Sequence, residues 1–172
     1  MYEWMPQRTN KTAEKMIFLM FGGSAALLLA ATLLPDVPFR WVFQLLALGL
    51  LTAAVFLVTR YRTKRFVYRI FEDENGGLDL TVTECAVNGK RAVTVCRVGL
   101  GNILRVVDLD LSDGGASLRE WKNLCRGGKK IFDYAIDLKP TRSIVIVVNE
   151  GGEELRIRLS YDDRLFQILS AS

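Results

Sequence analysis

The sequence predicts an α+β membrane protein, built as a two-helix transmembrane hairpin followed by a seven-stranded β sandwich or barrel with a C-terminal capping helix. Three observations support this fold class. Two apolar runs without any charged residue lie in the first part of the 172-residue chain. After Arg65 the apolar residues recur with the period of two that is typical of β-strands. The end of the chain returns to a helical pattern.

The apolar runs predict a membrane hairpin over residues 16–59, with spans at about 16–34 and 41–59. Each run has about 19 residues, which at ~1.5 Å per residue is enough to cross a hydrocarbon core of ~30 Å. The intervening "PDVPFR" contains two prolines, which favour a turn. A cleaved signal peptide before a single span is the alternative, but signal h-regions have only ~7–15 apolar residues. Two buried helices of a soluble protein are disfavoured because neither run has a polar face.

Cations flank the hairpin at its two chain ends and therefore predict its orientation. Arg8, Lys11 and Lys15 precede the first span, whereas the loop between the spans offers only Arg40. By the positive-inside rule, the N-terminal segment 1–15, both termini and the soluble domain are expected to be cytoplasmic. Residues 60–65 form a basic juxtamembrane linker, and attraction to anionic headgroups is worth ~1 kcal/mol per cation. Four linker residues are the candidate membrane-surface contacts: Arg60, Arg62, Lys64 and Arg65.

The composition excludes several classes of function. From residue 66 onward there are 15 Lys and Arg against 16 Asp and Glu, so the basic excess of the chain lies at the membrane. A nearly neutral soluble region lacks the charge of a nucleic-acid-binding protein. There is no histidine, and the three cysteines form no CxxC pair. We therefore expect no metal site, no cofactor, no catalytic constellation and no nucleic-acid partner.

Seven short segments after the linker predict the strands; several alternate between apolar and polar residues, whereas residues 143–149 are apolar on both faces, as in a central strand. Asn88-Gly89 is typical of a two-residue hairpin turn, and this pairing places Cys85 opposite Ala92 and Cys96 opposite Thr81. At the end of the chain, Ser160 is a candidate N-cap of a helix with an apolar face. The predicted strands are residues 66–72, 78–84, 90–98, 102–109, 131–138, 143–149 and 154–160.

This order of elements resembles the pleckstrin-homology (PH) fold, in which sheets of four and three strands pack together and a final helix closes one corner. Within that fold, "CRVGLGNILRV" and "SYDDRLFQIL" are similar to bacterial PH-like domains that follow a two-helix membrane hairpin. A five-stranded OB-type barrel is the rival, but it does not account for seven strands and a terminal helix. The resemblance implies that residues 66–172 form a binding scaffold. Residues 72–77, "EDENGG", are acidic where eukaryotic PH domains hold phosphoinositides with basic residues, so that activity is not transferred.

A helical insertion is predicted at about 117–126 between the fourth and fifth strands. Ser117 and Glu120 form a capping box, and Gly127-Gly128 ends the helix. Two interpretations stay open: a face for a partner or for lipid, or a helix that covers part of the core. The candidate face consists of Leu118, Trp121, Leu124, Arg126, Lys129 and Lys130.

Two weaker motifs are better explained as connections. Gly99 and Gly101 lack the third glycine and the following helix of a nucleotide loop. Asp108, Asp110 and Asp113 lack the bidentate glutamate of a calcium loop. The sequence thus predicts a non-enzymatic PH-like module, anchored in membrane lipids by its hairpin, that binds a protein partner, a larger membrane complex or another copy of itself. The alternative is a lipid-headgroup sensor that uses the juxtamembrane linker and the 117–130 helix.

Overall fold

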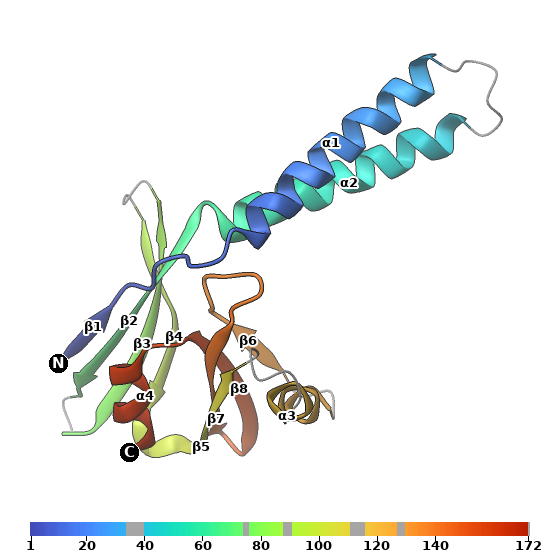
Figure 1. The fold of residues 1–172 in the computed structure, drawn as a ribbon. Helices are drawn as coiled ribbons and strands as arrows, with labels where there is room; N and C mark the ends of the chain where they lie inside the picture. Colours follow the sequence, from blue (N-terminus) through green and yellow to red (C-terminus); the bar gives the residue numbers. More distant parts are fainter. Residues whose placement is uncertain (34–39, 74–75, 88–90, 111–115, 127–129, 172) are drawn as a thin grey trace.

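The computed structural model describes residues 1–33, 40–73, 76–87, 91–110, 116–126 and 130–171, without the side chains of 116–118. It has an α+β architecture: a long hairpin of two helices projects from a domain of two β-sheets (Figure 1). The two chain ends both lie in that domain, away from the tip of the hairpin.

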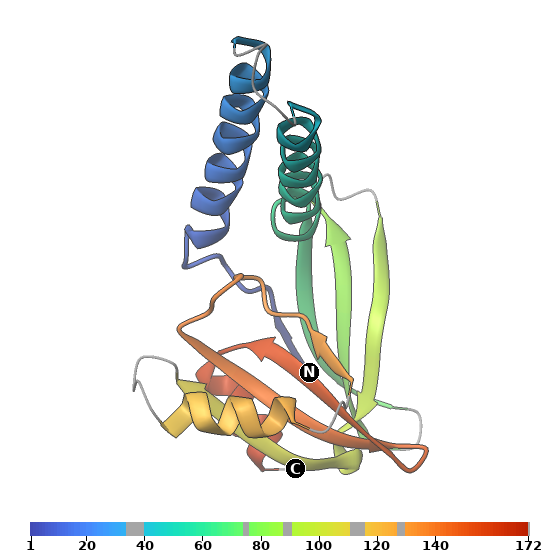
Figure 2. The same cartoon turned by 90° about the vertical axis from the view of Figure 1, so that its right-hand side faces the viewer.

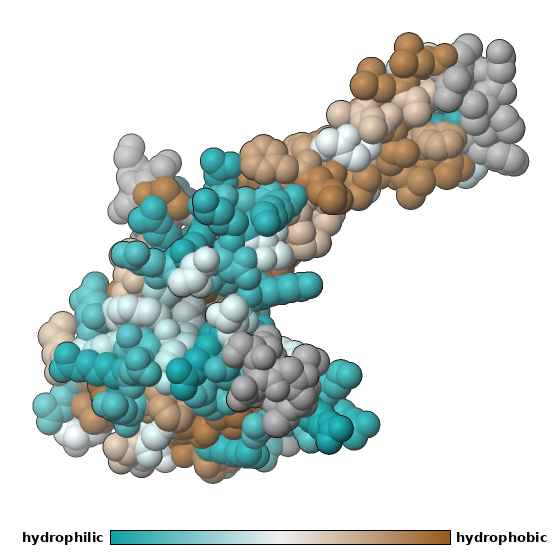
Figure 3. All heavy atoms as spheres, in the orientation of Figure 1, coloured by the Kyte–Doolittle hydropathy of each residue, from teal (hydrophilic) through white to brown (hydrophobic). Residues whose placement is uncertain are grey.

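The hairpin consists of α1 (Thr12–Leu33) and α2 (Arg40–Tyr61), each of 22 residues and long and apolar enough to cross a membrane. Small residues let the two helices approach closely. Ser24 Oγ donates a hydrogen bond to the carbonyl oxygen of Ala47 at 2.9 Å, and Ala47 and Ala54 are buried between the helices. Most of the remaining surface of the hairpin is apolar and exposed, in contrast to the polar surface of the domain (Figure 3).

The first sheet contains strands that precede the hairpin in the sequence and strands that follow it. Its order is β1 (Tyr2–Trp4), β2 (Lys64–Glu72), β3 (Leu78–Ala86) and β4 (Ala92–Gly99), and all neighbours are antiparallel. β1 precedes α1, whereas β2 follows α2. The hairpin is therefore inserted between two neighbouring strands of one sheet, which places both of its ends on the same side.

The second sheet has the order β5 (Ile103–Asp110), β7 (Arg142–Glu150), β8 (Glu153–Ser160) and β6 (Ile131–Asp133). A short 3-10 helix, η1 (Leu100–Asn102), turns the chain from β4 into β5. β6 is parallel to β8, whereas the other pairs in this sheet are antiparallel.

The prediction of seven strands is wrong, because the structure has two sheets of four. β1 was missed because a segment of three residues shows no periodicity, and its pairing with β2 is remote in sequence. The fifth predicted strand, 131–138, is regular only to Asp133. There the Asp133 carboxylate accepts a hydrogen bond from the amide of Ala135 at 3.0 Å, which favours a turn over a continued strand.

The predicted register of the β3–β4 pair is confirmed at one end and wrong at the other. Cys85 lies opposite Ala92 as expected, but Cys96 lies opposite Val82 instead of Thr81. The cause is a bulge between Val82 and Thr83, which shifts the register by one residue. Asn88-Gly89 lies outside the described residues. All three thiols are free.

The main core lies between the two sheets and is closed by α4 (Asp163–Ser170). Leu165 and Leu169 of α4 are completely buried in it, together with side chains of β2, β3, β7 and β8. The N-cap of α4 is Asp162, whose carboxylate accepts a hydrogen bond from the amide of Leu165 at 3.0 Å. Ser160, the expected cap, is instead the last residue of β8, and its Oγ accepts a hydrogen bond from the amide of Ile136.

Candidate functional site at the base of the hairpin

The N-terminal segment is bound along the domain before it enters α1. Asp137, only 6 % exposed, accepts hydrogen bonds from Thr9 Oγ1 at 2.8 Å and from the Thr9 amide at 3.2 Å. Its other carboxylate oxygen accepts from the amide of Asn10 at 3.4 Å. Where the chain leaves the hairpin, α2 ends at Tyr61 and β2 begins at Lys64. Both ends of the hairpin are thus joined tightly to the domain.

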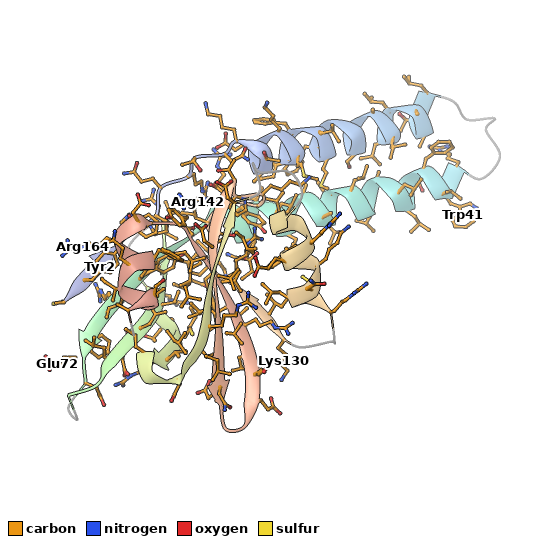
Figure 4. The ribbon with its side chains drawn as sticks, turned by 60° about the horizontal axis from the view of Figure 1, so that its bottom comes forward. Tyr2, Trp41, Glu72, Lys130, Arg142 and Arg164 are labelled. Atoms are coloured by element: carbon orange, nitrogen blue, oxygen red, sulfur yellow. The ribbon has the colours of Figure 1, made fainter. Side chains whose placement is uncertain are left out.

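The strand β1 fixes the beginning of the same segment. Glu3 pairs with Arg69 of β2 at 3.0 Å, and the ring of Trp4 packs against Tyr68 with 5.6 Å between centroids. Tyr2 lies beside Arg164 of α4 (Figure 4) and donates a hydrogen bond to Asp162. Burial and this hydrogen bond raise the pKa of Tyr2.

A hollow of about 700 Å³ lies where the N-terminal segment, the end of α2 and the start of β2 meet. Three guanidinium groups line it: Arg8 from the N-terminal segment, Arg62 from the turn after α2, and Arg65 from β2. Among the described residues, none that lines this hollow is acidic, and we call the hollow the arginine groove. The described residues that line it are Met5, Pro6, Gln7, Arg8, Arg62, Arg65, Val87 and Ile136.

The structure divides the predicted membrane-surface contacts into two pairs. Arg60 donates a hydrogen bond to the carbonyl oxygen of Asp133 and lies over the ring of Phe66, 4.9 Å from its centroid. Lys64 forms an ion pair with Glu84 at 2.9 Å. These two cations are therefore engaged within the domain.

Arg62 and Arg65, in contrast, are exposed and face the arginine groove together with Arg8. Within the part of the chain that the structure describes, the side chains of these three arginines make no hydrogen bond or ion pair. Sequence reasoning did not connect Arg8 with the linker residues. The antiparallel pairing of Trp4 with Tyr68 carries the N-terminal segment toward the start of β2, and this remote pairing has no local signal in the sequence.

The second predicted face lies on α3 (Ala116–Cys125), which covers the outer side of the second sheet (Figure 2). Leu124 is only 8 % exposed and packs with Val107, Leu109, Val145 and Val147. Trp121 packs against the same cluster, and the guanidinium of Arg158 lies 4.7 Å from the centroid of its ring. The apolar side of α3 thus faces its own sheet, which favours the interpretation of a helix that covers the core.

The other members of that predicted face are distributed differently. Arg126 and Lys130 are exposed. The side chain of Leu118 and all of Lys129 lie outside the described residues. Arg126 also offers its carbonyl oxygen to Nη1 of the buried Arg156 at 3.5 Å, a contact that ties the end of α3 to β8. The described cations of α3 therefore surround a helix whose apolar side is already covered.

The weaker sequence motifs lie in connections and ion pairs. Gly99 ends β4, and Gly101 lies inside η1, so neither precedes the N-terminus of a long helix. The carboxylate of Asp108 accepts a hydrogen bond from Nη2 of Arg142 at 2.5 Å, and Nε of Arg142 lies 3.1 Å from both of its oxygens. Asp113 lies outside the described residues. Among those that are described, no group of three or more acidic or cysteine side chains could hold a metal ion.

Comparisons of the sequence with protein-family models and with curated proteins find no match. The chemistry of the arginine groove is therefore inferred from its own residues.

Proposed function

We propose that this chain is a membrane-anchored, non-catalytic PH-like interaction module whose hairpin spans the membrane and whose domain and termini are cytoplasmic. The module binds a protein partner, a larger membrane complex or a second copy of itself. The observation that supports this function is the insertion of the hairpin between β1 and β2. Two connections fix the orientation of the domain at the membrane surface, so that it presents the same face to any partner there.

The shape and surface of the hairpin support its insertion. A helix of 22 residues is about 33 Å long, enough for a hydrocarbon core of ~30 Å. Trp41 lies at the end of the hairpin farthest from the domain (Figure 4), a position that suits the outer interface. The cations Arg8, Lys11, Arg62 and Arg65 lie at the opposite end, which supports a cytoplasmic domain.

The arrangement of strands supports a PH-like domain in a modified form. β1 to β4 would be the four-stranded sheet, β5, β7 and β8 the three-stranded one, and α4 the closing helix. α3 and β6 are then additions to the connection between β5 and β7. In this assignment the membrane hairpin replaces the first loop of the fold. The bacterial PH-like proteins that the sequence resembles carry the same combination of hairpin and domain.

Two measurements on the full-length protein test this function. The protein should stay in the membrane after alkaline carbonate extraction; its release would contradict the anchor. Affinity purification in mild detergent, followed by quantitative mass spectrometry, should then be compared with the Ile146→Asp variant, which places a charge in the main core. Partners that depend on the folded domain should be lost from the variant. An unchanged set of co-purified proteins would contradict an interaction module.

The arginine groove favours a second candidate function, the recognition of lipid headgroups. α3 would contribute little to it, because Trp121 and Leu124 pack on the second sheet. Any specific headgroup contact would instead involve the unpaired linker cations, Arg62 and Arg65.

A further inference from the structure

We propose that the arginine groove is a binding site for the phosphate group of an anionic membrane lipid, held by Arg8, Arg62 and Arg65. This inference rests on the proposed insertion of the hairpin in the membrane. It goes further by naming the ligand class, the three residues that bind it, and the reason why other juxtamembrane cations do not take part.

The position of the groove is the first argument. Arg62 follows directly on Tyr61, the last residue of α2, and Arg65 is the second residue of β2. Arg8 lies four positions before Thr12, the first residue of α1. If the two helices span the bilayer, the residues just beyond their ends lie at the level of the headgroups, where lipid phosphates are concentrated.

The charge of the groove is the second argument. Three guanidinium groups line one hollow that has no carboxylate among its described lining residues, and like charges repel one another. Arg60 and Lys64, which are close in sequence, do find partners within the domain. Among the four linker cations, the two left without a partner among the described residues, Arg62 and Arg65, are thus those that line the hollow. A phosphate would remove the repulsion, and the planar fork of a guanidinium matches two phosphate oxygens at once.

The shape of the groove is the third argument. Pro6 and Ile136 are buried beneath it, while Met5 and Val87 are 47 % and 45 % exposed beside the arginines. A volume of about 700 Å³ falls within the range of ~300–1,000 Å³ for small-molecule sites. Exposed apolar side chains next to a phosphate site suit the glycerol and upper acyl part of a lipid. Free phosphate would gain nothing from them.

The test measures lipid binding to the full-length protein in mild detergent by native mass spectrometry. The ligands are phosphatidic acid, phosphatidylglycerol, phosphatidylcholine, inorganic phosphate and a glutamate-rich peptide. The protein should retain one anionic lipid with at least tenfold preference over phosphatidylcholine. The Arg62→Gln/Arg65→Gln variant and the Arg8→Gln variant should each weaken this binding at least tenfold, because a hydrogen bond between charged groups is lost in each.

A matched control removes the same charge elsewhere. Arg119 and Lys122 are exposed on α3, so Arg119→Gln/Lys122→Gln should change lipid binding less than twofold. The Arg62→Lys/Arg65→Lys variant keeps the charge and should retain part of the affinity. Because the substituted side chains are exposed, the melting temperatures of all variants should agree with that of the unmodified protein.

Four outcomes would overturn the proposal. If the α3 control variant lost as much lipid affinity as the groove variants, the effect would come from the total charge of the protein and not from the groove. Inorganic phosphate bound as tightly as the lipid would identify a free-phosphate site, and a tighter glutamate-rich peptide would identify a protein partner. If phosphatidylcholine were retained as strongly as the anionic lipids, binding would not require a net negative headgroup. If carbonate extraction shows insertion while lipid preference is absent, only this inference fails; release by carbonate would instead contradict the anchored module itself.

Discussion

Tyr2 and Asp162, near opposite ends of the chain, are joined by a hydrogen bond of 2.6 Å from the phenol to the carboxylate. Asp162 also caps α4, so a single carboxylate connects the N-terminal strand with the helix that closes the core. The segment before the hairpin is in this way part of the folded domain.

The Tyr2→Phe variant should lower the free energy of unfolding by about 1–2 kcal/mol, since a partly buried hydrogen bond to a charged acceptor is lost. Asp162→Ala should have a larger effect, because it also removes the cap of α4. Urea unfolding of the full-length protein in detergent measures both. Tyr161→Phe is the matched control: it removes an exposed hydrogen bond to Asp163 and should change stability by less than about 0.5 kcal/mol. Equal effects of the two tyrosine variants would contradict the special role of Tyr2.

Asp137→Ala should release the N-terminal segment from the domain. The carboxylate accepts hydrogen bonds from Thr9 and Asn10, and all of them are lost in the variant. We expect a loss of about 2–3 kcal/mol and faster proteolysis between β1 and α1, measured by mass spectrometry of the fragments. Lys139→Ala, an exposed neighbour that contributes only its carbonyl oxygen to this contact, is the control. An unchanged rate of cleavage in Asp137→Ala would show that the hydrogen bonds of Asp137 do not hold the segment.

Trp121→Ala should destabilise the protein by about 2–4 kcal/mol, because it removes a ring that packs on the outer cluster and beneath Arg158. Leu124→Ala should act in the same direction and by a similar amount. Lys122→Ala, exposed on the same helix, should stay within about 0.5 kcal/mol of the unmodified protein. Chemical denaturation distinguishes these values. Full stability of Trp121→Ala combined with a loss of vesicle binding would instead assign this side of α3 to the membrane.

Stability should fall at high pH because of Tyr68. Burial raises its pKa to about 12. The folded protein keeps this proton while the unfolded chain loses it above pH ~10, so the stabilisation is complete below pH ~10 and is lost as the pH rises toward 12, by at most about 1.4 kcal/mol per pH unit. Tyr68→Phe should flatten this slope.

The same variant should also be less stable at neutral pH. The Tyr68 hydroxyl donates to the carbonyl oxygen of Tyr134 at 2.8 Å and accepts from the amide of Ser160 at 3.1 Å, so its removal leaves both groups without this partner, at about 1–3 kcal/mol. Thermal unfolding between pH 7 and 11 measures both the stability at neutral pH and its decrease at high pH. An identical slope in the two proteins would exclude Tyr68 as its source.

The orientation of the hairpin can be tested on intact cells with a membrane-impermeant thiol reagent. A cysteine introduced at Val37, between the two predicted spans, should be labelled from outside because the cations lie at the other end of the hairpin. Cys125 is exposed on the domain and serves as the internal control, which should react only after the membrane is permeabilised. The reverse pattern would contradict a cytoplasmic domain.

The sequence by itself determined the elements whose signal is carried by consecutive residues. The two uncharged runs correspond to α1 and α2. The continuous apolar run of β7, the alternation of β8 and the apolar face of α4 lie where the sequence predicts them. These patterns are local, because the period of a helix or strand is already visible within a few turns or residues.

Only the tertiary structure decided that Tyr2–Trp4 forms a strand, that β6 ends at Asp133, and that a bulge shifts Cys96 to face Val82. It also decided which cations are free: Arg60 and Lys64 find partners in the domain, while Arg62 and Arg65 meet Arg8 across the base of the hairpin. These five cationic positions look alike in sequence. They differ because strand pairing and ion pairing depend on groups that are remote along the chain and come together only when the sheets form.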